Sequence, residues 1–566
     1  MKRLGIMIFV VLACGLIFGA ARPDPRIPPS LVRIAKGPAL SMPALARLGI
    51  DVRQELATCL VALADRLDLR ALRRQGLQLT VLERNAAGRE FVLVDIRRPE
   101  AMSALQAAGR AVAVEPGTAV FWSDRGPAVE SVPSGLARKV LPARSILPYL
   151  RTRAVPDDAP TAALAYDAYI VDNILPLVSI ANLAADVQML QDFGTRYAST
   201  ASCESSGQAL FDAFSALGLD QVRFEPFHFS GAYESRNVVA EKTGETYPDD
   251  VYIVCAHYDS SSPAASRQTL APGADDNGSG VAAVLEAARA LAGCDLDFTV
   301  RFIAFSAEEW GLYGSRTYAA VARTAGERIL GVINLDMIAF ADEAPEDIHC
   351  IVNAESAWLG DLFLDAGEAY GGVDGTRIVD PSFVYSDHAA FWEYGYPALD
   401  ATEDDPLTNP YYHQITDTLD KLDLNFLVAS ARASTGLLAE LAQPVKPGFP
   451  PTPVGLGAEW VVHRSLFNAL SAVRLTWTAV AGAAGYNVYR SGAAHGEFLK
   501  ANAGLVTASE FLDSGATLDG TYYYVVTAVG QTGVEGNRSK AVAPPADPSG
   551  AAAARSAGSF LLWSLR

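Results

Sequence analysis

The chain has 566 residues, half of them hydrophobic, and carries a formal net charge of −19 at pH 7. This length predicts three or four domains, with enough apolar residues for several cores. A chain this acidic is not expected to bind nucleic acid or an anionic membrane surface.

Residues 1–21 have the features of a signal peptide. Lys2 and Arg3 precede the apolar run GIMIFVVLACGLIFG, and small residues stand before Arg22. We therefore expect a secreted or periplasmic protein, and no later stretch predicts a stable membrane span. The residues ending at Cys14 loosely resemble a lipoprotein box. Because the apolar run continues past Cys14, secretion is favoured over a lipid anchor.

Five of the six cysteines follow the signal peptide, which is a sparse and odd number for an exported chain. Such a number predicts no disulfide framework, and at most one or two bridges whose pairing stays open. The five are Cys59, Cys203, Cys255, Cys294 and Cys350.

Residues 26–128 contain three similar phrases, ALARLGIDV, ALRRQGLQLTV and ALQAAGRAVAV. Each predicts a short amphipathic helix, a glycine stop and a strand, and a strand-like run precedes each one. We expect a small, ferredoxin-like α+β module without a catalytic constellation. Its position suggests a prodomain that inhibits or assists folding; the alternative is a structural appendage or a partner-binding module. Residues 129–170 are Pro-rich and mixed in charge, which predicts a linker.

Residues 171–443 have the pattern of an α/β domain. Two apolar runs, VYIVCAHYD at 251–259 and FTVRFIAFSAEE at 298–309, are rich in β-branched and aromatic residues and end in acids. The apolar-periodic run VAAVLEAARALAG lies between them, so this stretch predicts two parallel strands joined by a helix. The expected fold class is α/β, with a mixed, mainly parallel sheet sandwiched by helices. In such sheets the site lies beyond the carboxyl ends of the strands.

Histidines and carboxylates gather at these predicted strand ends and in the loops that follow them. They are His257, Asp259, Asp275, Asp276, Glu308, Glu309, Asp336 and His413. A lone H-x-D or E-E is an ordinary feature of a buried pair or a solvated loop, whereas the ordered series is specific. Without cations, so many carboxylates in one concave site would repel one another or hold protons. Two zinc ions and one hydroxide would leave the ligands Asp275, Glu309 and Asp336 near neutrality.

This ordered series resembles the M28 family of co-catalytic zinc peptidases, of the bacterial leucyl aminopeptidase type. The matching stretches are AHYDS, PGADDNGSG, FSAEEWGLYGS, INLDM, YSDHAAFWEYGYPA and YYHQITDT, within about residues 180–441. The resemblance implies a zinc exopeptidase fold that binds two Zn²⁺ ions. It implies that His257 and Asp336 hold one zinc, that Glu309 and His413 hold the other, and that Asp275 bridges them.

The same resemblance implies roles for further residues. Glu308 would be the general base, taking a proton from water between the metals and returning it to the leaving amine. Asp259 would hold the ring of His257, and the bond between Asp275 and Asp276 would be cis. Tyr385 is a candidate to support the oxyanion. The expected substrates are peptides with a free N-terminus, whose first peptide bond is hydrolysed.

Residues 450–545 predict a β-sandwich of short alternating strands that resembles a bacterial fibronectin type III module. Trp477 and Tyr486 are expected in its core. The module would provide attachment to a surface or polymer, or only spacing. Residues 546–566 are rich in Ala and Ser and predict a disordered tail.

Three alternatives to the aminopeptidase remain open at this point. A glutaminyl cyclase would use one zinc on the same scaffold, and a carboxypeptidase would accept blocked N-termini. A protein of another class would be a metal-free adhesion protein that acts through its sandwich module. The intact sequence D-D-N-G-S-G favours the two-zinc peptidase.

Overall fold

The computed structural model describes residues 29–141 and 167–545 with short gaps. The gaps are residues 37–39, 41–44, 46–49, 57, 65–68, 70–71, 73–76, 88, 99, 125–127, 134–135, 137, 232, 343–345, 405–407 and 465–468. The predicted signal peptide, Cys14, most of the predicted linker and the tail at 546–566 lie outside the described residues. The described chain divides into two compact units, with the boundary between Arg89 and Glu90.

The first unit contains a four-stranded antiparallel sheet with the order β2-β3-β1-β4. Its strands are β1 (Ser30–Ala35), β2 (Asp51–Glu55), β3 (Cys59–Ala64) and β4 (Leu79–Glu83). Apolar side chains of the sheet, including Ile34 and Leu60, pack with Leu72 from the segment between β3 and β4. This unit therefore has its own hydrophobic core.

A second antiparallel sheet, with the order β6-β7-β5-β8, belongs to the other unit. It consists of β5 (Val92–Asp95), β6 (Arg110–Glu115), β7 (Thr118–Trp122) and β8 (Arg138–Val140), with helices α3 (Ala101–Ala108) and α4 (Ala128–Ser131). Val92, Phe121 and Val140 are part of one continuous core with the large α/β domain. The structure thus divides the predicted 26–128 module, and β8 lies within the residues 129–170 that were predicted to be a linker.

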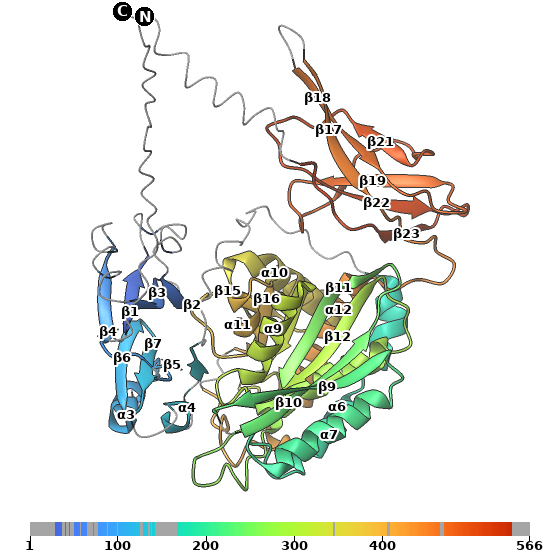
Figure 1. The fold of residues 1–566 in the computed structure, drawn as a ribbon. Helices are drawn as coiled ribbons and strands as arrows, with labels where there is room; N and C mark the ends of the chain where they lie inside the picture. Colours follow the sequence, from blue (N-terminus) through green and yellow to red (C-terminus); the bar gives the residue numbers. More distant parts are fainter. Residues whose placement is uncertain are drawn as a thin grey trace, which may run out of the picture. The chain divides into compact units, whose positions relative to one another are not determined.

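The large domain is built on an eight-stranded mixed sheet with the order β15-β14-β16-β13-β11-β12-β10-β9 (Figure 1). The strands are β9 (Gln221–Phe229), β10 (Tyr233–Lys242), β11 (Tyr247–His257), β12 (Phe298–Phe305), β13 (Arg328–Leu335), β14 (Ile348–Val352), β15 (Gly375–Val379) and β16 (Ala398–Glu403). The central strands β16, β13, β11 and β12 are parallel, whereas β10 and β9 are antiparallel to their neighbours. The predicted α/β fold class is confirmed.

Helices cover both faces of this sheet (Figure 1). They are α6 (Ile180–Gln191), α7 (Ala201–Ser215), α8 (Gly280–Leu291), α9 (Tyr313–Ala325), α10 (Ala357–Ala366), α11 (His388–Glu393) and α12 (Leu424–Ala442). Helix α8 packs on β11 and β12 and against α12, and its small alanines allow that close approach. On the other face, the ring of Phe305 contacts Tyr318 of α9 and Phe391 of α11.

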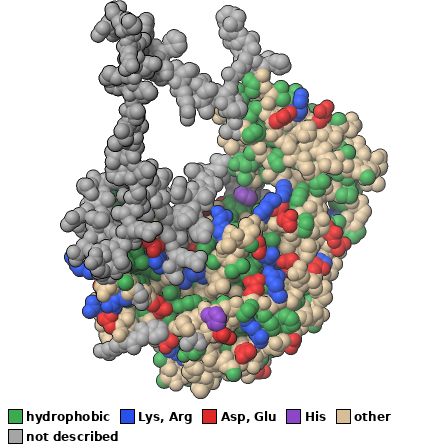
Figure 2. All heavy atoms as spheres, in the orientation of Figure 1, with side chains coloured by type: hydrophobic (Ala, Val, Ile, Leu, Met, Phe, Trp, Pro, Cys, Tyr) green, Lys and Arg blue, Asp and Glu red, His purple; other side chains and the backbone are tan. Residues whose placement is uncertain are grey.

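The run Ile170–Gln191 is long and apolar enough to cross a membrane by length and composition, which the sequence analysis did not anticipate. Its Ile170, Leu183 and Val187 are fully buried in the core of the α/β domain, so it serves as a packing element in this fold. All five described cysteines are free. On the face drawn in Figure 2, acidic and basic side chains are interspersed over the described surface.

The C-terminal residues form two antiparallel sheets, with the orders β17-β18-β21 and β20-β19-β22-β23. The strands are β17 (Gly457–Arg464), β18 (Ala469–Thr476), β19 (Gly485–Ser491), β20 (Leu499–Lys500), β21 (Glu510–Asp513), β22 (Tyr523–Val529) and β23 (Glu535–Arg538). Both sheets contribute to one apolar core that includes Trp477 and Tyr486. A terminal β-domain is thus present, and its likeness to fibronectin type III stays a prediction.

Candidate metal centre

The register of the parallel strands brings the acidic residues together. His257, the last residue of β11, pairs with Phe305 of β12, and Cys255 pairs with Asn334 of β13. The chain therefore leaves β12 towards Glu308 and Glu309, and leaves β13 towards Asp336, at the same edge of the sheet. This is the carboxyl edge at which sites are expected in parallel α/β sheets.

A first group of ligand atoms surrounds the Nε2 atom of His257. This atom lies 3.3 Å from Oδ1 of Asp336 and 3.3 Å from Oδ1 of Asp276. Oε2 of Glu308 is 4.0 Å away. The other ring nitrogen, Nδ1, is 3.0 Å from the backbone oxygen of Asp259, which can fix the ring orientation and leave Nε2 for a metal.

A second group surrounds His413, which lies in the loop that follows β16. Its Nε2 is 2.9 Å from Oε2 of Glu309 and 3.0 Å from Oδ2 of Asp276. The ring of Tyr412 stacks on the ring of His413, with 4.0 Å between centroids. Asp276, Glu309 and His413 are buried, and Tyr412 is partly buried.

Asp276 occupies the position between the two groups that was predicted for Asp275. One oxygen of Asp276 faces His257 and the other faces His413. The carboxylate of Asp275 instead accepts hydrogen bonds from the backbone N–H of Ala339 and from Nδ2 of Asn409, each at 3.0 Å. The prediction was wrong by one residue, because neighbouring side chains point in different directions and the sequence Asp-Asp does not reveal which one faces the histidines.

The cis peptide bond is displaced in the same way. It joins Asp276 to Asn277, and the predicted bond between Asp275 and Asp276 is not the cis one.

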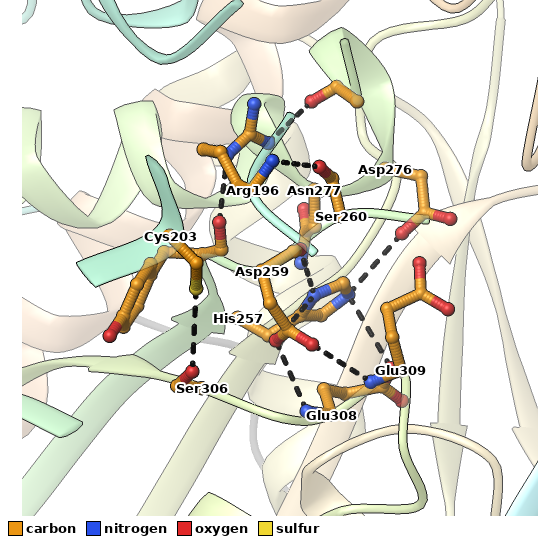
Figure 3. Close-up of polar contacts among 12 residues, drawn as sticks. Arg196, Cys203, His257, Asp259, Ser260, Asp276, Asn277, Ser306, Glu308 and Glu309 are labelled. Atoms are coloured by element: carbon orange, nitrogen blue, oxygen red, sulfur yellow. Dashed lines mark hydrogen bonds and ion pairs between the residues drawn. The ribbon is translucent and has the colours of Figure 1, made fainter. Parts of the chain in front are cut away.

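Asp259 contacts the glutamate pair as well as His257 (Figure 3). Its Oδ1 accepts the backbone N–H of Glu308 at 3.1 Å, and its Oδ2 accepts that of Glu309 at 3.3 Å. Its carboxylate is 3.7 Å from Nδ1 of His257, farther away than its backbone oxygen. Burial raises the pKa of Asp259 to about 7, while His257 opposes that rise. The predicted role on His257 thus falls to the main chain of Asp259, and its side chain holds the Glu308–Glu309 backbone.

Several supporting residues were missed by the sequence analysis. Asp417 accepts the backbone N–H groups of Asp275 and Asp276, at 2.9 Å and 3.1 Å, and so holds the loop that carries the central aspartate. The Ser386 hydroxyl donates to Oδ2 of Asp336 at 2.5 Å. Both residues lie inside the stretches that matched the family, but nothing in their local pattern distinguishes a supporting residue from a turn residue.

Tyr385 and the nearby His388 have partners outside the metal groups. The Tyr385 hydroxyl donates to Oγ1 of Thr118 in β7 at 3.3 Å, so its support of an oxyanion stays a prediction. Nε2 of His388 lies 3.0 Å from the backbone oxygen of Phe383, which gives this nitrogen a partner outside the metal groups.

The donor set fits zinc. Ligands about 2.0–2.1 Å from a tetrahedral zinc ion lie about 3.3 Å apart, and the His–carboxylate distances of 2.9–3.3 Å match that spacing. Oε1 of Glu309 and Nδ1 of His413 are buried without a hydrogen-bond partner. Burial alone would lower the pKa of His413, yet the carboxylates of Glu309 and Asp276 raise it to about 9. Without cations this cluster therefore retains protons, and metal binding would displace them.

The groups open into a cavity. One part of its lining comes from the second sheet: Asp95 and Arg97 at the end of β5, Leu136, and Arg138 of β8. Arg138 donates from Nε and Nη2 to the backbone oxygen of Glu309, at 3.1 Å and 2.7 Å. The sequence analysis assigned no site residue to this region.

Comparison with known proteins agrees with the fold and the motifs. Residues 237–437 match the model of Peptidase family M28. A relative named "Probable leucine aminopeptidase" from Trichophyton verrucosum is 29% identical over 308 residues, which cover 52% of this chain and 79% of the relative. The chain therefore carries a domain of peptidase family M28, and it is a zinc metallopeptidase of the aminopeptidase type.

Two solved structures are also similar. LapB from Legionella pneumophila has a TM-score of 0.49 and 19% identity, over 62% of this chain and 99% of that chain. The glutaminyl cyclase of Porphyromonas gingivalis has a TM-score of 0.40 and 22% identity, over 46% of this chain and 98% of that chain.

Proposed function

We propose that this chain is an exported aminopeptidase that uses two zinc ions to hydrolyse the first peptide bond of peptides with a free N-terminus. One observation carries the two-ion proposal. The two oxygens of Asp276 face two different histidines, at 3.3 Å and 3.0 Å, and each histidine has a further carboxylate beside it. A carboxylate shared in this way is the arrangement that a pair of neighbouring cations requires.

The residues divide naturally between the two ions. His257 and Asp336 would hold one, His413 and Glu309 would hold the other, and Asp276 would touch both. Bound zinc would supply Lewis acidity, which polarises the scissile carbonyl and makes water a stronger acid.

Glu308 is the group of this chain that would move the proton. Its backbone is fixed by Asp259, so its carboxylate is held beside the first metal group. It would accept a proton from the attacking water and deliver that proton to the leaving amine. Its neighbour Glu309 is oriented towards His413, so the two adjacent glutamates have separate tasks.

The complete second group distinguishes this proposal from the one-zinc cyclase. A single ion would need only one of the two groups, whereas this chain has both the pair of His257 and Asp336 and the pair of His413 and Glu309. The M28 relative that matches is named an aminopeptidase, which favours that activity over a carboxypeptidase. Leucine as the preferred first residue is part of this proposal. Export rests on residues 1–21, and attachment through the C-terminal β-domain rests on its sequence resemblance.

The metal assignment is tested with a matched pair of neighbouring residues. Asp276→Asn should bind at most one zinc per chain and lose at least a thousandfold in kcat/KM on leucine p-nitroanilide, because the shared charge is removed. Asp275→Asn should keep two zinc ions, measured by plasma mass spectrometry. The reverse pattern would show that Asp275 is the shared ligand. A wild-type protein with one zinc that cyclises glutaminyl peptides would establish the cyclase instead.

The proton-transfer assignment is tested with the adjacent glutamates. Glu308→Gln should keep both zinc ions and lower kcat by about 10²–10⁴-fold, the usual contribution of a general base. Glu309→Gln should lose zinc together with activity, because it removes a ligand. Full activity of Glu308→Gln with zinc retained would refute the role given to Glu308.

A further inference from the structure

Opposite charges line different parts of the active-site cavity. The acids of the metal groups come from the ends of the large sheet, whereas the two arginines among its described lining residues, Arg97 and Arg138, come from the second sheet. A peptide with two free ends carries the complementary pair of charges, an ammonium group at one end and a carboxylate at the other. On the side of the second sheet, Asp95 pairs with Arg97, and Arg138 lies beside the metal ligand Glu309.

Arg97 is held ready for an anion. Its Nε and Nη2 donate to Oδ2 of Asp95, at 2.8 Å and 2.5 Å, and Asp95 is itself buried. The guanidinium lies over the ring of Phe383, 5.5 Å from its centroid. The side chain is 48% exposed, and its Nη1 donates to no described residue. One edge of a fixed guanidinium is therefore available to a ligand, and this planar fork suits a carboxylate.

Arg138 adds a second positive charge close to the metal groups. Two of its nitrogens bind the backbone oxygen of Glu309, while Nη1 is buried without a hydrogen-bond partner. No described carboxylate forms an ion pair with this arginine. A buried charge without a counterion is costly, and an anionic ligand in the cavity would relieve that cost.

We propose that Arg97, with the charge of Arg138 behind it, binds the C-terminal carboxylate of the substrate, so that the preferred substrates are short peptides and above all dipeptides. The proposal rests on the aminopeptidase function proposed above. In a dipeptide, about one residue length, some 3.5 Å, separates the scissile carbonyl from the C-terminal carboxylate. Arg138 binds the backbone oxygen of the metal ligand Glu309, so its positive charge lies beside the metal groups.

The direct test compares two substrates that differ only in this charge, leucyl-leucine and leucyl-leucinamide, on the full-length zinc-loaded protein. The wild-type protein should prefer the free acid at least tenfold in kcat/KM, mainly through KM, because a charge-assisted pair is lost with the amide. Arg97→Gln should abolish the preference while activity on the amide stays within about twofold. Arg97→Lys should restore part of it, since the charge returns without the fork.

Arg110→Gln serves as the matched control. Arg110 lies in β6 of the same sheet, is 62% exposed and does not line the cavity, so the preference for the free acid should remain. Equal wild-type rates on acid and amide would overturn this inference and leave the aminopeptidase intact. An equal loss on both substrates in Arg97→Gln would show a structural role and would also overturn it. Hydrolysis of neither substrate, nor of leucine p-nitroanilide, would be a failure of the proposed function itself.

Discussion

The two N-terminal sheets differ in what they pack against, although similar sequence phrases predicted them as one module. The first sheet, β2-β3-β1-β4, encloses a core of its own. The second, β6-β7-β5-β8, shares one core with the M28 domain and contributes to the lining of its cavity. Proximity in sequence therefore does not decide which part of a chain belongs to the catalytic unit.

Buried polar contacts mark the second sheet as part of the enzyme. Lys139 of β8 pairs with Glu393 of α11, with both side chains almost completely buried. In the first sheet, the pair of Arg53 and Asp51 lies within β2 and is partly exposed, at 18% and 34%. A removable prodomain would be expected to leave a surface that tolerates water. Removal of the second sheet would expose apolar core and a cavity wall. The role of the predicted 26–128 module as an inhibitor or a folding aid stays a prediction.

Truncation should produce the largest difference between the sheets. A chain that starts at Glu90 should fold and keep kcat/KM on leucine p-nitroanilide within about threefold, because the first sheet has a separate core. A chain that starts at residue 160, which also lacks the second sheet, should be insoluble or lose at least a hundredfold in activity. Soluble yield, thermal unfolding and activity measure the difference. Full activity of the shorter chain would show that the second sheet is an appendage.

The sequence predicted the strands of both sheets better than their grouping. The runs LVRIA, TCLVALA and EFVLVDI correspond to β1, β3 and β5, and the strands that close the three phrases correspond to β2, β4 and β6. Strands β7 (Thr118–Trp122) and β8 (Arg138–Val140) were not predicted, and two of the three residues of β8 are charged. Local patterns report which residues alternate, whereas grouping depends on distant partners such as Glu393 that no local pattern contains.

In the metal centre, too, the local sequence pattern left one choice undecided, namely which of two adjacent aspartates faces the histidines. The ordered His, Asp and Glu residues pointed to one carboxyl edge, and the structure places His257, Glu309, Asp336 and His413 there. The choice between the two adjacent aspartates depended on side-chain direction in an irregular loop. That direction is set by Asp417, Ala339 and Asn409, which lie more than sixty residues away in the chain.

Substitutions of the charge pairs should give a smaller, graded contrast between the sheets. Glu393→Gln should lower the free energy of unfolding by about 3–5 kcal/mol, because it leaves the Lys139 ammonium buried without its partner. Burial already lowers the pKa of Lys139 to about 8, against the opposing effect of Glu393. Lys139→Met should cost less, since Glu393 keeps Arg316 at 3.2 Å. Asp51→Asn in the first sheet should cost about 1 kcal/mol or less.

Urea unfolding at pH 7, followed by circular dichroism and by activity, measures these three variants together. Activity should fall in parallel with the unfolding of Glu393→Gln, because Arg138, a neighbour of Lys139, contacts the backbone of Glu309. Asp51→Asn should leave the activity midpoint unchanged. If Asp51→Asn and Glu393→Gln shifted that midpoint equally, the first sheet would be coupled to the catalytic unit as strongly as the second. The two sheets would then differ in core packing alone, and that difference would not affect the active site.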